Sequence, residues 1–159
     1  MHRPMHRPSS AGELEDWLAE HGWSPGRDIG DRADALIAER IEDFHSQGQE
    51  LASLSTARSF LHSYGLLRLP ISPTVTLVLD PTGGYEEDAE DIVELAGDLG
   101  VPLFPVGYET YEGGVLLIDE DSRFFYLHDT GPYFLGRGPT EMLVNRLTGK
   151  TVHASQYYV

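Results

Sequence analysis

Acidic residues at helical spacing are the side chains of this sequence whose type and spacing most clearly indicate a chemical role. Two rows follow an i, i+4 pattern: Glu86, Glu90, Glu94 and Asp98, and beside them Glu87 and Asp91. Like charges at this spacing oppose a helix by roughly 0.2–0.5 kcal/mol per pair. No Lys or Arg lies between Arg68 and Arg123 to offset that repulsion. The pattern leaves two interpretations open, a solvated helix face or a docking surface for a basic partner.

Two other short segments carry residue types that act in catalysis or metal binding. His128-Asp129 has the composition of a base with an orienting carboxylate, and Asp119-Glu120-Asp121 offers oxygen ligands for a hard cation. For His128-Asp129 the favoured interpretation is a strand end that enters a turn. For Asp119-Glu120-Asp121 it is a hairpin turn, because no glycine follows the triplet at EF-hand spacing. The sequence also lacks a Gly-x-Ser-x-Gly elbow and a His-Glu-x-x-His helix. We therefore expect no enzymatic activity, no metal and no cofactor.

Charge and composition restrict the classes of partner. The chain of 159 residues has 26 acidic and 11 basic residues and a formal net charge of −15. Phosphate backbones repel such a chain, so we expect no direct nucleic-acid binding. Cationic proteins are attracted and meet it faster, but from charge alone the favoured interpretation is that the acidity only keeps the protein soluble. The absence of cysteine excludes disulfides and thiolate chemistry and suits the cytoplasm. Apolar runs long enough to span a membrane are absent from the sequence.

A single α+β domain is expected to position these residues. Helical periodicity predicts three N-terminal helices, a fourth from about 86 to 99 and a closing helix, and strand composition marks the segments 66–69, 75–79, 103–107, 114–119, 123–128 and 133–135. Most strands are joined by turns, which favours a mostly antiparallel sheet flanked by helices. Residues 10–151 form the expected domain.

The two ends of the chain are expected to lie outside this domain. Residues 1–9 contain a tandem Met-His-Arg-Pro repeat and are expected to form a disordered arm, with either Met1 or Met5 as the start. Residues 152–159 are expected to form a tail or an edge strand, and such an edge would permit a homo-oligomer.

Local signals also predict how the helices begin and which sides they bury. Ser10 with Glu13 forms a capping box. Caps are expected at Asp28 or Asp31 for the second helix and at Thr140 for the closing helix, and Ser53 or Ser55 is expected to open the third helix. For the fourth helix the expected buried stripe is Ala89, Ile92, Val93, Ala96 and Leu99.

A compact corner separates the first two helices. Its residues are Trp23, Ser24, Pro25, Gly26 and Arg27. Pro25 fixes its own φ and Gly26 permits a left-handed backbone, so the pair predicts a tight turn. Trp23 can anchor the turn if its N–H finds a partner, and Arg27 can cap carbonyls or pair with a carboxylate. A buried structural corner is favoured over an exposed recognition loop.

Several of these strings together resemble the third subgroup of the SUKH superfamily. The resemblance spans roughly residues 13 to 149, and its most specific parts are the Trp-x-Pro-Gly-Arg corner and the Phe-Pro-Val-Gly step at 104–107. Weaker parts are Ala57-x-x-Phe60-Leu61-x-x-Tyr64-Gly65 and the strand at 114–119. The sequence departs from the family at Leu66 and at the turn 120–123, where glycines are common.

The resemblance implies an α+β fold and a role as an immunity protein, one that binds and neutralises a cognate bacterial toxin, a nuclease or a deaminase. It brings no catalytic residues. Occlusion of a basic toxin face by acidic residues is the expected mechanism, and the expected contacts are Glu86, Glu87, Glu90, Asp91, Glu94, Asp98, Asp119, Glu120 and Asp121. The alternative is a housekeeping protein-binding module without a toxin partner.

Overall fold

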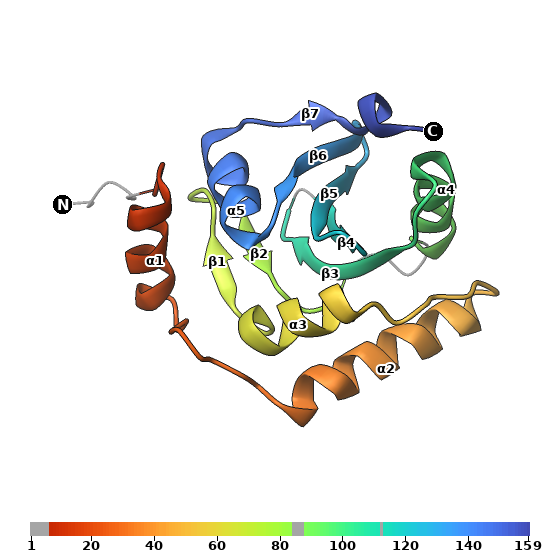
Figure 1. Ribbon diagram of the computed structural model, residues 1–159, viewed down its shortest axis with the longest axis horizontal. Coiled ribbons are helices and arrows are strands. Elements are labelled where there is room, and N and C mark those ends of the chain that lie inside the picture. Colours follow the sequence, from red (N-terminus) through yellow and green to blue (C-terminus); the bar gives the residue numbers. More distant parts are fainter. Residues whose placement is uncertain (1–6, 84–87, 112) are drawn as a thin grey trace.

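The computed structural model describes residues 7–83, 88–111 and 113–159. Within these ranges the helices are α1 (Ala11–Glu20), α2 (Asp31–Ser46), α3 (Ser55–Tyr64), α4 (Ala89–Leu99) and α5 (Pro139–Thr148), followed by a 3-10 helix (Ala154–Tyr157) (Figure 1). The strands are β1 (Arg68–Pro70), β2 (Thr76–Val78), β3 (Leu103–Glu109), β4 (Val115–Asp119), β5 (Arg123–His128), β6 (Gly131–Arg137) and β7 (Val152–His153). None of the helices in the described ranges is long and apolar enough to cross a bilayer.

One seven-stranded sheet organises the molecule. The spatial order of the strands is their order in the chain, from β1 to β7, and each neighbouring pair is antiparallel. The connection from β2 to β3 contains α4. The register shifts at two irregularities, between Pro105 and Gly107 in β3 and between Phe124 and Phe125 in β5. The predicted α+β class with an antiparallel sheet is confirmed.

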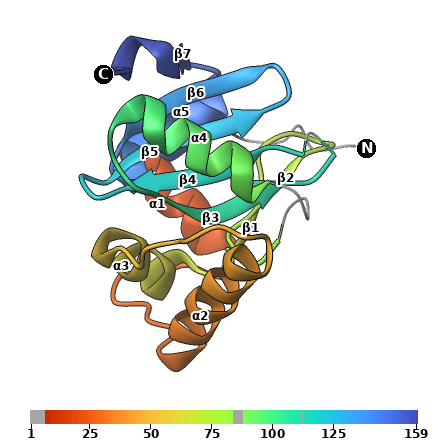
Figure 2. The ribbon, with the colours of Figure 1, turned by 90° about the vertical axis from the view of Figure 1, so that its right-hand side faces the viewer.

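Helices cover both faces of the sheet. Viewed from the side, α4 lies in front of the strands, and α1 and α5 lie behind them (Figure 2). The helices α2 and α3 pack together below the sheet in both views. Every residue of β4 is buried, because side chains that alternate between the two faces meet a helical layer on each side. This burial explains why Val115–Ile118 is continuously apolar rather than alternating.

The first and third helices begin where the sequence predicts, and the second and fifth lack the predicted caps. Ser10 Oγ accepts the Glu13 N–H at 3.3 Å, as a capping box requires, and Glu13 Oε2 accepts the N–H of Ser9, one residue before the N-cap, at 3.2 Å. α3 begins at Ser55, with Leu54 as its N-cap residue. The N-cap residues of α2 and α5 are Gly30 and Gly138, without a side-chain cap, so the caps predicted there are wrong. For α5, Pro139 starts the helix instead, because its missing N–H needs no partner there.

The buried side of α4 differs from the predicted stripe. Ala89, Ile92 and Leu99 are buried as expected, but Leu95 joins them and Val93 is 38% exposed. Both Val93 and Leu95 continue an apolar row at helical spacing, and the larger leucine is the one that is buried against the sheet. This choice of row decides which acidic residues of α4 face a neighbouring element.

The two departures from the expected glycines both have a left-handed backbone. Leu66 has a φ of +67° and Ser122 a φ of +61°. Leu66 redirects the chain from α3 into β1, and its N–H donates to Leu79 O at 2.7 Å. Ser122 closes the turn between β4 and β5, and its N–H donates to Asp119 O at 3.2 Å. A side chain in this conformation costs roughly 1–2 kcal/mol, which is why glycine is the usual residue at such positions.

Candidate functional site

An acidic cleft of about 430 Å³ lies between α4 and one end of the sheet. One wall is α4, the other is formed by the start of β4 and the turn from β5 to β6, and Tyr158 closes it from the C-terminal segment. The cleft is lined by five carboxylates among the described residues: Asp88, Asp91, Glu94, Asp98 and Asp129. Those described lining residues include no Lys or Arg. We call this feature the acidic cleft.

The helical wall brings together part of the predicted acidic surface. Asp91, Glu94 and Asp98 line the cleft and are exposed. Glu90 is exposed on the same helix but does not line the cleft. At 3.6 residues per turn, each i+4 step turns about 40° around the helix axis, so the row through Glu90 winds away from the cleft. Glu86 and Glu87 lie outside the described residues.

Asp88 lies at the N-terminal end of this wall and was not predicted. It is the N-cap residue of α4 and is only 7% exposed. Arg40 Nη2 donates to Asp88 Oδ2 at 2.6 Å, whereas Asp88 Oδ1 has no hydrogen-bond partner among the described residues. Burial raises the pKa of Asp88, and the neighbouring Arg40 guanidinium opposes that rise. Arg40 also lies over the Phe44 ring, 4.9 Å from its centroid, which positions its guanidinium beside Asp88.

The opposite wall contains the predicted base–orienter pair, and the structure places it in a turn. β5 ends at His128, and Asp129 and Thr130 connect it to β6. His128 Nδ1 accepts the Thr130 N–H at 3.2 Å and lies 3.0 Å from Thr130 Oγ1. The His128 ring also stacks on Tyr126, with 5.7 Å between centroids. His128 therefore orders the turn, and Asp129 extends from it to the rim of the cleft.

Tyr158 brings the end of the chain to the same place. Val159 N–H donates to Asp98 O at 3.0 Å, which attaches the C-terminal segment to the end of α4. The pKa of Tyr158 is raised, first by burial and then by the charges of Asp98 and Glu94. The hydroxyl therefore lies within the electrostatic field of the helical wall. Its contribution was not predictable, because nothing near residue 158 in the sequence indicates contact with α4.

The acidic turn at 119–121 does not belong to the cleft, and Asp119 is a structural residue. Asp119 is 0% exposed. Its Oδ1 accepts the N–H groups of Asp121 and Arg123 at 2.9 and 2.8 Å, and its Oδ2 accepts Arg123 Nε–H at 2.6 Å. A carboxylate buried in this way stabilises the hairpin and is not available to a partner. Glu120 and Asp121 are exposed.

The corner between α1 and α2 is anchored by Trp23 and Arg27, but it is not the buried corner that was expected, because none of its five residues is buried. Trp23 stacks on Tyr64 with 5.4 Å between ring centroids, and its Nε1–H donates to Ser63 Oγ at 3.2 Å. Arg27 donates from Nη1 to Ser63 O at 2.7 Å and from Nη2 to Gly65 O at 2.8 Å. These carbonyls end α3, where a cation is favoured. Pro25 and Gly26, with a φ of +82°, form the exposed turn.

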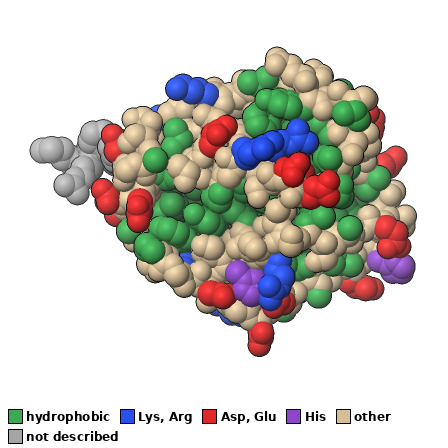
Figure 3. Space-filling model, in the orientation of Figure 1, with side chains coloured by type: hydrophobic (Ala, Val, Ile, Leu, Met, Phe, Trp, Pro, Cys, Tyr) green, Lys and Arg blue, Asp and Glu red, His purple; other side chains and the backbone are tan. Residues whose placement is uncertain are grey.

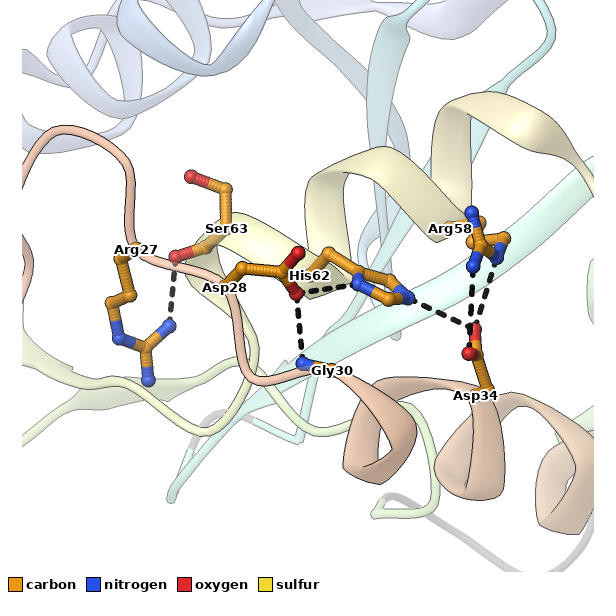
Figure 4. Close-up of polar contacts among 7 residues, drawn as sticks. All are labelled: Arg27, Asp28, Gly30, Asp34, Arg58, His62 and Ser63. Atoms are coloured by element: carbon orange, nitrogen blue, oxygen red, sulfur yellow. Dashed lines mark hydrogen bonds and ion pairs between the residues drawn. The ribbon is translucent and has the colours of Figure 1, made fainter.

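A charged cluster beside the corner links α3 to the start of α2 (Figure 4). The ring nitrogens of His62 lie 2.6 Å from Asp28 Oδ1 and 2.9 Å from Asp34 Oδ1, and Arg58 Nε donates to Asp34 Oδ1 at 3.0 Å. Hydrogen bonds to Asp34 and Asp28 raise the pKa of His62. The pKa of Asp28 is lowered mainly by the Gly30 N–H, and that of Asp34 mainly by His62. This cluster fixes the corner.

Sequence reasoning also missed a buried ion pair between β3 and α5. Glu109 is 2% exposed and accepts three hydrogen bonds, from Tyr126 Oη–H at 2.8 Å and from Arg146 Nε–H and Nη2–H at 2.6 and 2.7 Å. The bidentate pair attaches α5 to β3, and Arg146 lies 5.5 Å from the Tyr126 ring centroid. Its role is structural.

The described residues place no group of three or more His, Asp or Glu side chains where a metal ion would be held. The arrangement that the structure offers is instead an open, negatively charged cleft on a rigid frame. Acidic side chains follow the right-hand edge of the molecule in Figure 3, the side on which Figure 1 places α4. Such a surface attracts cationic groups.

Comparison with known proteins identifies the family. The model of the SUKH-3 immunity protein family matches residues 11–149, from the first residue of α1 to the glycine that follows α5. Neither the curated proteins nor the solved structures yield a match to the chain. The matched segment includes the corner, the sheet up to β6 and the α4 wall of the cleft. The chain therefore belongs to the SUKH-3 immunity protein family.

Proposed function

We propose that this protein acts in the cytoplasm as a non-enzymatic inhibitor of a cognate bacterial toxin, a nuclease or a deaminase. It binds the basic face with which the toxin engages its substrate and blocks access to it. The family supports the toxin-immunity role. The acidic cleft is the single observation that supports this mechanism, because it concentrates carboxylates on one face and has no cation among its described lining residues.

The expected kinetics follow from this charge distribution. Complementary fields accelerate the encounter of two proteins and make the association rate fall as salt screens them. The affinity of the complex then depends on a buried centre of the interface and on the quality of its contacts rather than on the interface area. Asp91, Glu94 and Asp98 are exposed and do not contribute to the core, so they can act in recognition without being required for folding.

The test uses the product of the adjacent gene as the partner. Glu94→Lys with Asp98→Lys reverses two charges at i, i+4 on the cleft wall. The matched control is Asp16→Lys with Glu20→Lys, which makes the same charge change at the same spacing on exposed positions of α1. Because α1 lies on the other side of the sheet from α4 (Figure 2), the control changes net charge without changing the cleft.

We expect the wild-type protein to capture the partner and to protect cells that express it. The cleft variant should associate about tenfold more slowly at low salt, and the α1 control should retain most of the wild-type rate. Equal rates for the two variants would remove the cleft from the interface. No capture at any salt concentration would contradict the toxin-inhibitor role and favour a housekeeping binding module.

A further inference from the structure

The turn between β3 and β4 presents a tyrosine that the fold does not use. Tyr111 is 90% exposed, and its side chain makes no hydrogen bond or ring contact with the other described residues. Burial of an aromatic ring is what normally compensates for the entropy of ordering it, and this exposed ring gains none of that stabilisation. The residue type at position 111 therefore needs another explanation.

The backbone makes tyrosine an unfavourable choice at this position. Tyr111 has a φ of +66°, the left-handed conformation that strains a residue with a Cβ and that glycine adopts without strain. The other described non-glycine residues with a positive φ, Leu66 and Ser122, are partly buried. Tyr111 alone among these combines the strain with nearly full exposure. Strain of this kind is concentrated at functional sites, so a strained and exposed aromatic residue indicates a contact outside the chain.

Hydrogen bonds hold the base of this turn to the strands on both sides. Thr110 N–H donates to Thr76 O at 3.0 Å, and Thr110 Oγ1 accepts the Thr76 N–H at 2.9 Å. Gly113 N–H donates to Glu109 O at 3.1 Å, and Glu109 N–H donates to Gly114 O at 2.9 Å. An aromatic side chain on such a backbone gives up only two side-chain torsions on binding, which suits it to be the anchor of an interface.

Tyr111 lies beside the acidic cleft, because Gly113 of the same turn lines it. Among the described residues, the exposed large apolar side chains are Val93 on α4, Tyr111 in this turn, Tyr158 and Val159 in the C-terminal segment, and Val152 on β7. All but Val152 therefore belong to segments that frame the cleft. Protein interfaces combine an aromatic, apolar centre with a polar rim, and here the neighbouring carboxylates give that rim a negative charge. The complementary surface is an apolar pocket bordered by Lys or Arg.

We propose that Tyr111 is the anchor residue of the interface with the toxin, and that its ring inserts into an apolar pocket bordered by basic side chains. The carboxylates of the acidic cleft accelerate the encounter, whereas Tyr111 determines how slowly the complex dissociates. Because the cognate toxin is the partner, this assignment rests on the proposed function and deepens it. It places the affinity of the complex on a residue that the acidic pattern of the sequence does not include.

The test compares two glycine substitutions that relieve the same backbone conformation. Tyr111→Gly and Ser122→Gly each remove the side chain of a left-handed residue in a turn between strands, and each should raise Tm by about 1–3 °C. With the adjacent gene product as partner, Tyr111→Gly should weaken binding about 30-fold through faster dissociation. Ser122→Gly should bind like the wild type. Tyr111→Phe, which keeps the ring, should remain within about threefold of the wild-type affinity.

Salt concentration separates the anchor from the carboxylates. The loss of affinity in Tyr111→Gly should be the same at low and high salt, because the ring carries no charge. The slower association of Glu94→Lys with Asp98→Lys should approach the wild-type rate as salt screens the cleft. A salt-dependent loss in Tyr111→Gly would mean that the turn acts through the charges of the cleft, and the anchor role would be wrong.

The remaining outcomes distinguish failure of the anchor from failure of the proposed function. If Tyr111→Gly lowers Tm, the ring stabilises the fold and the anchor role is wrong. If the gene product is captured and dissociates from Tyr111→Gly and Ser122→Gly at the wild-type rate, the toxin-inhibitor role stands and the anchor role is wrong. If the wild-type chain captures no gene product at any salt concentration, the inhibitor role is wrong and the anchor role is lost with it.

Discussion

Replacing Arg27 tests whether the corner is held mainly by its two hydrogen bonds. The guanidinium donates to Ser63 O at 2.7 Å and to Gly65 O at 2.8 Å, and these carbonyls end α3. Arg27→Ala removes both donors. Trp23 keeps its stacking on Tyr64 in this variant, so the corner should loosen without losing its aromatic anchor.

The expected loss of stability follows from the geometry. A hydrogen bond from a charged donor contributes roughly 1.5–3 kcal/mol. Arg27 is partly exposed, so water replaces part of what is lost and the lower value applies to each bond. We expect Arg27→Ala to reduce the free energy of unfolding by about 3 kcal/mol, or Tm by roughly 6–12 °C in a chain of this size. Arg27→Lys keeps the charge but not the paired N–H donors of the planar guanidinium, and should lose about half as much stability.

Urea unfolding monitored by tryptophan fluorescence and calorimetry measures both quantities. Arg32→Ala is the control, because it removes the same charge from an exposed position in the first turn of α2 and should change stability by less than about 0.5 kcal/mol. If Arg27→Ala and Arg32→Ala are equally stable, the two hydrogen bonds do not hold the corner. If Arg27→Lys is as stable as the wild type, the charge of residue 27 and not the paired guanidinium donors stabilises the corner.

Three further predictions concern other parts of the frame. Arg146→Ala leaves the buried Glu109 carboxylate without its cation and should cost about 3–5 kcal/mol, whereas the double variant Arg146→Met with Glu109→Gln should recover part of that loss in urea unfolding. The raised pKa of His62 means that its stabilisation is complete below the unfolded pKa, near 6.5, and is lost as pH rises through the folded pKa. The stability difference between wild type and His62→Ala should therefore be larger at pH 6 than at pH 8.5, and a difference independent of pH would contradict the charged pairing. Ser122→Gly should raise Tm by about 1–3 °C because it relieves the positive φ, and Ser122→Ala, which keeps a Cβ, should not.

Much of the fold was accessible from the sequence because it is encoded locally. Helical periodicity and strand composition located the principal elements, and of the two kinds of partner that the sequence left open for Arg27 the structure has the carbonyls. The starts of α2 and α5 were less predictable, since Gly30 and Gly138 cap through backbone geometry that leaves no side-chain signature. The choice of Leu95 over Val93 depended on the sheet that covers α4, and no local pattern contains that information.

The candidate site was predictable on one wall only. Asp91, Glu94 and Asp98 follow from helical spacing, which is a local property. Asp129 and Tyr158 reach the same cleft through the order of the strands and the path of the C-terminal segment. The pairing of Asp88 with Arg40 joins residues 48 positions apart, and a buried ion pair at that separation has no sequence signature. Acidic composition likewise gave no sign that Asp119 would be enclosed by its own hairpin.

The order of the strands has a consequence for how the chain is made. Because each strand pairs with the one before it, the sheet can grow by successive addition as the polypeptide leaves the ribosome, with short connections to close except where α4 and α5 intervene. The helical layer behind the sheet cannot follow that schedule, since α1 packs on α5, and most of the domain is synthesised between them. The part of α1 that α5 covers must therefore remain uncovered until Pro139–Thr148 has emerged. During synthesis, the nascent protein exposes its earliest helix for longest, and that is where a chaperone would find it.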